Sequence, residues 1–220
     1  MTISPLPFDS ELFGYPVGKA VISRNWNEET FLEEATNYQL VYIFSENQLP
    51  IISSSIQLIE TRVVFGKNLI GNQPTDCEIR KFEGNLNYEL ESLAFQSGTF
   101  SRFKTDIRLN AGEFEKLYKL WIQKSVEEKG VLVADGNAGF VSCNVRSDTA
   151  QIGLIAVDKN QRGKGLGKRL IKAAEAFAFT KGAKKMKIGT QEANHPASAL
   201  YSKLGYEVVE KVEVWHYWSS

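Results

Sequence analysis

Hydrophobic and polar positions change along the first hundred residues in short segments, some with a strand period and some with a helix period. Period-two alternation and compact apolar runs predict strands at residues 17–22, 39–44, 58–65 and 77–82. Helical spacing predicts helices at residues 27–38 and 86–95. The first of these helices has acidic residues in its first turn, where negative charge interacts favourably with the helix dipole and stabilises the helix.

The pattern is clearer in the second half of the chain. Helical spacing covers residues 113–128, and apolar strands at 131–134 and 140–145 flank the turn sequence DGNAG, as in an antiparallel hairpin. The continuous apolar run IGLIAV, residues 152–157, is typical of a strand at the centre of a sheet that is covered on both faces. The remaining predicted elements are a helix with an apolar stripe at Leu166, Leu170, Ala173 and Phe177, a strand at 185–190, a helix at 196–205 and a strand at 206–218.

This alternation of strands and helices predicts a mixed sheet of the α/β or α+β class rather than a helix bundle. At 220 residues the chain suffices for one large domain or two small ones. Ser and Gly cluster in QSGTFSRF, residues 96–103, which indicates a boundary between two units. We therefore expect a smaller N-terminal unit at residues 1–98 and a second domain at residues 99–220.

Charge is balanced over the chain but uneven along it. Lys plus Arg and Asp plus Glu both number 26, which argues against general nucleic-acid binding. Residues 159–169 nevertheless contain five basic side chains and no acidic one. Such a patch suits a small anionic ligand better than a polyanion, although a solvated surface would have the same composition.

The sequence also suggests where the protein is found. MTISPLPFDS lacks the basic and apolar segments of a secretory signal, and no apolar run approaches the length of a membrane span. Cys77 and Cys143 lie far apart and show no metal-ligand spacing. The sequence neither supports nor excludes a disulfide between them, and a reducing compartment is the default expectation. We expect a cytoplasmic protein without membrane insertion.

The stretch QRGKGLGKRL, residues 161–170, places a glycine-rich turn between a strand and a helix. The first N–H groups of a helix have no internal partner and the helix dipole adds positive charge there, so this arrangement favours anions. The turn is not a P-loop, because Arg169 follows Gly167-Lys168 where that motif needs Ser or Thr. It is not a dinucleotide fingerprint either, because its glycines are at positions 163, 165 and 167.

RGKGLG, residues 162–167, resembles the R/Q-x-x-G-x-G/A motif of the GNAT superfamily of acetyl-CoA-dependent N-acetyltransferases. The resemblance implies the GNAT fold, a mixed central sheet flanked by helices, with acetyl-CoA as cosubstrate and loop amides from Gly163 to Lys168 on its pyrophosphate. A glycine-kinked helix start without a ligand is the alternative. The cofactor-binding residues that the resemblance implies are Ile155, Ala156, Val157, Arg162, Gly163, Lys164, Gly165, Leu166, Gly167, Lys168 and Asn194.

The downstream segment NHPASALYSKLGY, residues 194–206, looks like the family's N-x6-Y-x3-G-[FY] pattern. The resemblance implies that Asn194 contacts the pantetheine arm and that Tyr201 is the catalytic acid that protonates the departing thiolate. A phenol can supply that proton at neutral pH, although Tyr201 could instead simply pack against the sheet. The family also implies a broken ladder between the strands of Ile155 to Val157 and Lys187 to Thr190, which would leave backbone donors for the acetyl carbonyl.

Further segments are similar to bacterial TDP-fucosamine acetyltransferases, which acetylate the 4-amino group of a dTDP-4-amino-4,6-dideoxyhexose. They are FDSELFG at residues 8–14, FSRFKTD at 100–106, the helix ending near Trp121-Ile122, and the final TQEAN and WHYW. This similarity implies a nucleotide-linked aminosugar as acceptor and a smaller N-terminal αβ unit beside it. Arg102 and Phe103 suit phosphate binding and base stacking, although a loop anchor beside a core phenylalanine fits them equally well.

Other readings stay open. No general base is named, because the strand before the glycine loop contains no carboxylate and the sequence does not rank Glu78 against Glu192. His195 suits a surface position or a helix cap, and His216 suits a packed position in the last strand. The rival acceptors are a peptide N-terminus, a lysine or a small polyamine, and the rival class is a non-catalytic module that binds CoA or a sugar nucleotide. No metal is expected. The aromatic WHYW is either core or a contact of a homodimer.

Overall fold

One mixed sheet passes through the parts of the chain that the computed structural model describes, residues 2–23, 25–71 and 78–219. Within these residues the strand order is β1-β2-β3-β10-β4-β9-β8-β7-β6-β5. The strands are β1 (Ser4–Pro5), β2 (Val17–Ile22), β3 (Leu40–Ser45), β4 (Ile56–Asn68), β5 (Ile79–Lys81), β6 (Val131–Ala134), β7 (Gly139–Arg146), β8 (Thr149–Val157), β9 (Lys185–Gln191) and β10 (Glu207–Trp218).

The helices are α1 (Pro7–Phe13), α2 (Glu28–Ala35), α3 (Tyr88–Ser97), α4 (Arg102–Thr105), α5 (Glu113–Glu127), α6 (Leu166–Thr180) and α7 (His195–Lys203). Four of them begin where a side chain satisfies a free amide: α2 and α3, where Asn27 accepts from Thr30 N and Asn87 accepts from Leu90 N, and likewise α4 and α7. The longer predicted helices and strands are all present with small shifts of their ends, whereas β1, α1 and α4 were not predicted. The predicted mixed sheet flanked by helices is confirmed.

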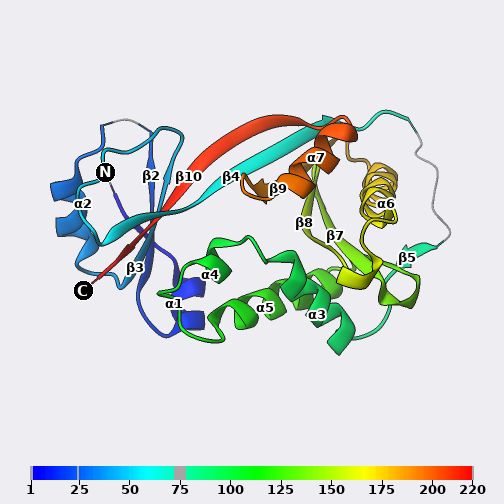
Figure 1. The fold of residues 1–220 in the computed structure, drawn as a ribbon, viewed down its shortest axis with the longest axis horizontal. Helices are drawn as coiled ribbons and strands as arrows, with labels where there is room; N and C mark the ends of the chain where they lie inside the picture. The colour runs from blue at the N-terminus through cyan, green and yellow to red at the C-terminus, as the bar shows by residue number, and fades with distance from the viewer. Residues whose placement is uncertain (1, 24, 72–77, 220) are drawn as a thin grey trace.

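Strands from the two halves of the chain interleave in the middle of the sheet. β4 pairs antiparallel with both β9 and β10, and β10 pairs on its other side with β3. Figure 1 shows β4 and β10 as a long twisted ribbon that joins β2 and β3 to the part of the sheet carrying α6 and α7. The WHYW segment lies in β10 and is therefore inside the sheet rather than at an edge. The division of the chain at residue 98 and the homodimer stay predictions.

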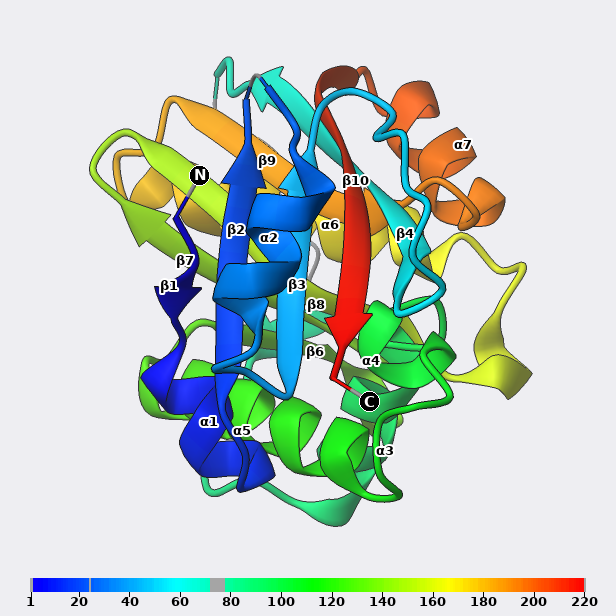
Figure 2. The same cartoon turned by 90° about the vertical axis from the view of Figure 1, so that its left-hand side faces the viewer.

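Three apolar clusters pack against the sheet. α6 covers one face with Leu170 and Ile171, which pack with Ile152 of β8 and Ile188 of β9. α3 and α5 cover the opposite face, where Leu117 and Ile122 pack with Phe140 of β7, Leu154 of β8 and Tyr42 of β3. The third cluster lies under α2, around Phe31 and Ile43. Figure 2 shows α2 in front of β2 and β3, with α1, α3 and α5 gathered at the bottom of the view.

Candidate functional site

Strands β8 and β9 separate along their length. They pair in parallel from Thr149–Lys185 to Ile152–Ile188, and the pairing ends there although both strands continue. A bulge in β8 lies at the same place, because Val141 and Cys143 of β7 face Ile155 and Ile152. The Ser142 hydroxyl accepts the N–H of Leu154 at 2.8 Å and so fixes the bulge. The broken ladder that the family resemblance implied is confirmed, and it begins at Gly153 and Gly189.

The glycine loop leads from β8 into α6. Gly163 and Gly165 have φ values of +80° and +78°, in the left-handed region that favours glycine, and Gly165 is the N-cap of α6. No side chain caps this helix end, and its first turn contains no acidic residue. The Arg162 Nε donates to the carbonyl oxygen of Val157 at 3.1 Å, which ties the loop to the end of β8. The loop therefore presents free amides and basic side chains to solvent, as an anion site requires.

A cleft of about 440 Å³ joins the glycine loop to the separated strands. Ten of the eleven predicted cofactor-binding residues line it, with Tyr201: Ile155, Ala156, Val157, Arg162, Gly163, Gly165, Leu166, Gly167, Lys168 and Asn194. Lys164 does not line the cleft and instead bonds Gln161 Oε1 at 2.8 Å. Asn194 is also the N-cap of α7, where its side chain accepts from Ala197 N at 3.4 Å. The roles of these residues toward a ligand stay predictions.

Tyr201 lies on α7, and its ring is held from both sides. The ring of Phe65 meets it edge-on at 5.5 Å between centroids, and the ring of Tyr206 lies at 6.4 Å. The side chain is buried apart from its place in the cleft wall, and its hydroxyl has no hydrogen-bond partner among the described residues. Burial raises the pKa of Tyr201 to about 12, so the phenol keeps its proton at neutral pH. Tyr201 is thus a protonated phenol, held by its neighbouring rings in the wall of the cleft.

Tyr118 of α5 and Ser97 of α3 form the cleft wall on the opposite face of the sheet, and sequence reasoning missed both. Burial raises the pKa of Tyr118 to about 12; the Ser101 hydroxyl acts against this, and the Glu60 carboxylate adds to it. Gly98 allows the tyrosine to pack here, because a Cβ at that position would lie 2.4 Å from Tyr118 Cζ. A glycine just after a predicted helix was the available sequence signal, but its partner ring could not be identified.

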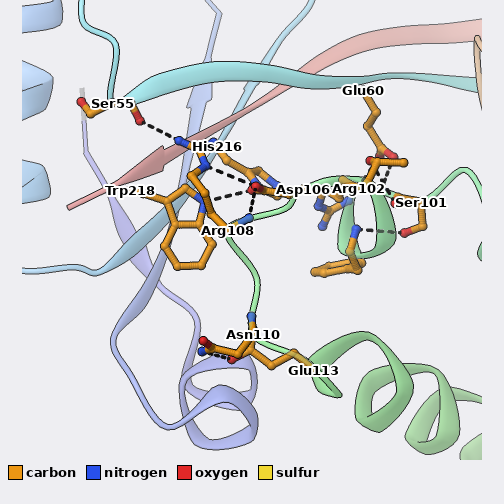
Figure 3. A network of polar contacts seen from close by, with 12 residues as sticks. Ser55, Glu60, Ser101, Arg102, Asp106, Arg108, Asn110, Glu113, His216 and Trp218 are labelled. Atoms are coloured by element: carbon orange, nitrogen blue, oxygen red, sulfur yellow. Dashed lines mark hydrogen bonds and ion pairs between the residues drawn. The ribbon is translucent and has the colours of Figure 1, made fainter. Parts of the chain in front are cut away.

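The predicted acceptor residues Arg102 and Phe103 do not line the cleft. Glu60 of β4 accepts from Arg102 N at 2.9 Å and from Arg102 Nη1 at 3.4 Å, and the guanidinium lies against the rings of Tyr42 and Phe103. Figure 3 shows Glu60 reaching from β4 to Arg102 at the start of α4. Phe103 is only 4% exposed, in the core under α5. Their roles in phosphate binding and base stacking stay predictions. The contacts seen here are those of the alternative, in which Arg102 anchors the loop and Phe103 is a core residue.

Asp106, at the end of α4, organises a second buried polar network (Figure 3). Its Oδ2 lies 2.6 Å from His216 Nδ1 and accepts from Trp218 Nε1 at 2.9 Å, while its Oδ1 accepts from Arg108 Nε at 3.2 Å. Burial opposes its ionisation, but these hydrogen bonds hold the pKa of Asp106 well below its usual range. Burial lowers the pKa of His216 to about 4, although its bond with Asp106 acts the other way. His216 is therefore neutral and fixes β10 against the segment after α4.

The other candidates of the sequence lie away from the cleft. Glu192 pairs with Lys211 at 2.7 Å and Glu78 pairs with Arg169 at 2.6 Å, and His195 is exposed at the start of α7. Cys143 is a buried free thiol, while Cys77 lies outside the described residues. In the described ranges no three His, Cys, Asp or Glu side chains group as a metal site would require, and the expected absence of a metal stays a prediction. No helix in those ranges is long and apolar enough to cross a membrane.

Comparisons with known proteins agree with this geometry. The model of the Acetyltransferase (GNAT) family matches residues 88–206, more than half of the 220 residues. A Bacillus subtilis protein, provisionally named as a ribosomal protein bS18-alanine N-acetyltransferase, is 35% identical over 78 residues, which are 35% of this chain and 52% of that protein. An uncharacterized N-acetyltransferase of Methanocaldococcus jannaschii is 30% identical over 113 residues, 47% of this chain and 50% of that protein.

The matched parts span about half the length of these two relatives. Among solved structures, a GCN5-related N-acetyltransferase from Sphaerobacter thermophilus superposes with a TM-score of 0.56 at 15% identity, covering 86% of this chain and 64% of that one. At such an identity the similarity concerns the fold alone. The mixed sheet and the helices around it thus have a known fold.

Proposed function

The chain belongs to the GNAT acetyltransferase family, and on that premise we propose that it transfers the acetyl group of acetyl-CoA to a primary amine. GNAT acetyltransferases use acetyl-CoA, and the residues present here fit it. The free amides of Gly163 to Lys168, with Arg162 and Lys168 beside them, suit a pyrophosphate. The gap between β8 and β9 suits an extended pantetheine arm that bonds unpaired strand amides.

One observation supports this proposal most strongly: a single cleft is lined by the glycine loop, the separated strands and Tyr201. The amine nitrogen attacks the thioester carbonyl carbon, so that a C–N bond forms and the C–S bond breaks. Unpaired N–H groups of β8 stabilise the charge that develops on the carbonyl oxygen. Sulfur leaves with the electron pair and takes the proton of Tyr201, and the amine gives its own proton to water. Solvent then restores the tyrosine proton.

For the acceptor we propose a nucleotide-linked aminosugar, a dTDP-4-amino-4,6-dideoxyhexose. The support is the similarity of residues 8–14, 100–106 and the final segments to TDP-fucosamine acetyltransferases. The amine of such a sugar is less basic than that of lysine, because neighbouring oxygens withdraw electron density. A neutral fraction is then present at pH 7, which is consistent with the absence of any carboxylate among the residues that line the cleft.

A peptide N-terminus is the second candidate acceptor. The specific observation in its favour is the Bacillus subtilis relative, which is named as acting on an alanine of a ribosomal protein and is 35% identical over the matched part. That match covers about a third of this chain, so we place this acceptor second.

The test is release of free thiol from acetyl-CoA in the presence of a panel of amines. The panel contains dTDP- and UDP-linked 4-aminosugars, an alanine-initiated peptide, a lysine peptide and a polyamine. We expect the fastest release with the dTDP-linked aminosugar. Faster release with the peptide would replace the acceptor and keep the chemistry, whereas binding of acetyl-CoA without release for any amine would support the non-catalytic module.

A further inference from the structure

The gap between β8 and β9 begins with two glycines that face each other across it. Ile152 and Ile188 form the last pair, and Gly153 and Gly189 follow directly on the two strands. Both glycines are exposed. Because neither has a side chain, the sheet is open at the point where the proposed function requires the acetyl group.

The opening leads to the α5 side of the sheet. Ile188 of β9 packs in the core under α6, so Gly189, the next residue, faces the other way. On β8, a Cβ at Gly153 would lie 3.1 Å from the hydroxyl oxygen of Ser142, and Leu154 packs in the cluster under α5. The cleft is lined by Tyr201 on the α6 and α7 side and by Tyr118 on the α5 side. It therefore passes through the sheet.

A second cavity, of about 290 Å³, meets the cleft at Gly153. It lies between the end of α5 and the strands β7 and β8, and its wall is rich in hydrogen-bonding side chains. Asn144 Nδ2 donates to Glu128 Oε2 at 2.6 Å within it. The polar wall includes Ser125, Glu128, Asn144, Arg146, Thr149 and Gln151. Amide, hydroxyl, carboxylate and guanidinium groups of this kind suit a hydroxylated ring better than an apolar side chain.

Arg62 of β4 lies on the other side of the opening. A Cβ at Gly189 would lie 3.9 Å from Arg62 Nε, which places the guanidinium beside the gap on the α5 side. Its strand partner is Gln191, another residue of the cleft wall. Within the described parts of the chain, the side chain of Arg62 makes no hydrogen bond or ion pair, unlike that of Arg102, which pairs with Glu60. A guanidinium with all its donors free suits a phosphate or another planar or tetrahedral anion.

We propose that Arg62, beside the opening at Gly153 and Gly189, binds an anionic group of the acceptor. The acceptor is then an amine on a hydroxylated ring: its hydroxyl groups lie in the cavity of Arg146 and Gln151, and its phosphate lies against Arg62. This inference rests on the proposed acetyl transfer and adds the acceptor site to it. It also distinguishes the acceptor anion from the CoA pyrophosphate, which the glycine loop at the other end of the cleft would bind.

The experiment compares two acceptors that share one amine, a 4-amino-4,6-dideoxyhexose and the same sugar linked to dTDP. Arg62→Gln is expected to lower kcat/KM for the dTDP-linked sugar by about 10- to 100-fold, because one charge-assisted contact is lost. The same variant should leave kcat/KM for the free sugar within about twofold, and Arg62→Lys should restore part of the difference. Lys185→Gln is the matched control, since it removes an exposed cation from β9 four residues before Gly189.

A second variant tests the opening itself. The backbone at Gly189 accepts a side chain, because a Cβ there would meet only Arg62 Nε, at 3.9 Å, and Gly189→Leu would extend that side chain from the opening. We expect it to lower kcat/KM for both sugars while the Kd for acetyl-CoA, measured by calorimetry, changes by less than about threefold. The proposal is wrong if Arg62→Gln affects both sugars equally or neither, or if the wild type acetylates a peptide and neither sugar. In those cases acetyl transfer itself stands, whereas a wild type that acetylates no amine would overturn the proposed function as well.

Discussion

Replacing Tyr201 with phenylalanine removes one oxygen atom from the cleft wall and leaves the rest of the site in place. The ring contacts with Phe65 and Tyr206 involve only carbon atoms of the Tyr201 ring, so the variant keeps them. The hydroxyl has no partner within the described residues, so no buried group loses a hydrogen bond. We therefore expect the free energy of unfolding to change by less than about 0.5 kcal/mol.

The effect on turnover should be much larger. If the phenol donates the proton to the departing thiolate, its loss should lower kcat by about 10²- to 10⁴-fold, equivalent to about 3–5 kcal/mol in the barrier. The affinity for acetyl-CoA should be nearly unchanged, because the loop amides and the strand gap are unaltered. The change should thus appear in kcat rather than in substrate binding.

The assay is stopped-flow thiol release at saturating acetyl-CoA, with calorimetry for acetyl-CoA binding and urea unfolding for stability. Tyr206→Phe is the matched control, because Tyr206 is equally buried beside Tyr201 but does not line the cleft. A loss in kcat of less than about tenfold for Tyr201→Phe, or an equal loss for Tyr206→Phe, would refute the role of the phenol as general acid.

Three further changes test the buried histidine, the contact of Gly98 with Tyr118, and the glycine loop. The free energy of unfolding should fall as the pH drops from 7 to 4.5, by up to about 1.4 kcal/mol per pH unit, because an unfolded histidine binds a proton near pH 6.5 whereas His216 has a pKa of about 4 in the fold. Gly98→Ala should destabilise the protein by about 1–3 kcal/mol and slow turnover, since its Cβ must displace Tyr118 from the cleft wall. Gly163→Ala should cost about 1–2 kcal/mol of stability and also weaken acetyl-CoA binding, because an alanine is strained at φ +80° in the loop that would hold the pyrophosphate. Urea unfolding and calorimetry measure these effects.

Controls separate the local effects from general destabilisation. His216→Gln should flatten the dependence of stability on pH between 7 and 4.5, and an unchanged slope would show that another group is responsible. Gly182→Ala matches Gly163→Ala, since Gly182 also has a positive φ of +86° and nothing around it but lies outside the cleft. It should lose similar stability and bind acetyl-CoA normally. Equal loss of acetyl-CoA binding in both would contradict the assigned role of the loop.

Local patterns in the sequence were sufficient for the longer helices and strands and for one side of the cleft. The run IGLIAV, the glycines after it and the helix stripe at Leu166 and Leu170 are consecutive, so their geometry follows from nearby residues. The same holds for Asn194 and Tyr201, which share one helix seven residues apart. These features lie next to one another in the chain, and the structure places them in one cleft.

Features that depend on distant pairing could not be predicted. The insertion of β4 between β9 and β10 joins residues more than a hundred positions apart, and it alone brings Glu60 to Arg102 and Arg62 to Gly189. The pairing of Asp106 with His216 crosses 110 positions. Arg102 was predicted to bind the phosphate of the acceptor, and the sequence could not show that its guanidinium pairs with Glu60, 42 positions earlier in the chain.

Acetyl transfer through the cleft can be observed by mass spectrometry of an amine panel after incubation with acetyl-CoA and the protein. We expect an acetylated dTDP-4-aminosugar, formed at the rate of thiol release, and almost none with Tyr201→Phe. Thiol release without an acetylated amine, or an equal yield from the Tyr201→Phe variant, would contradict it.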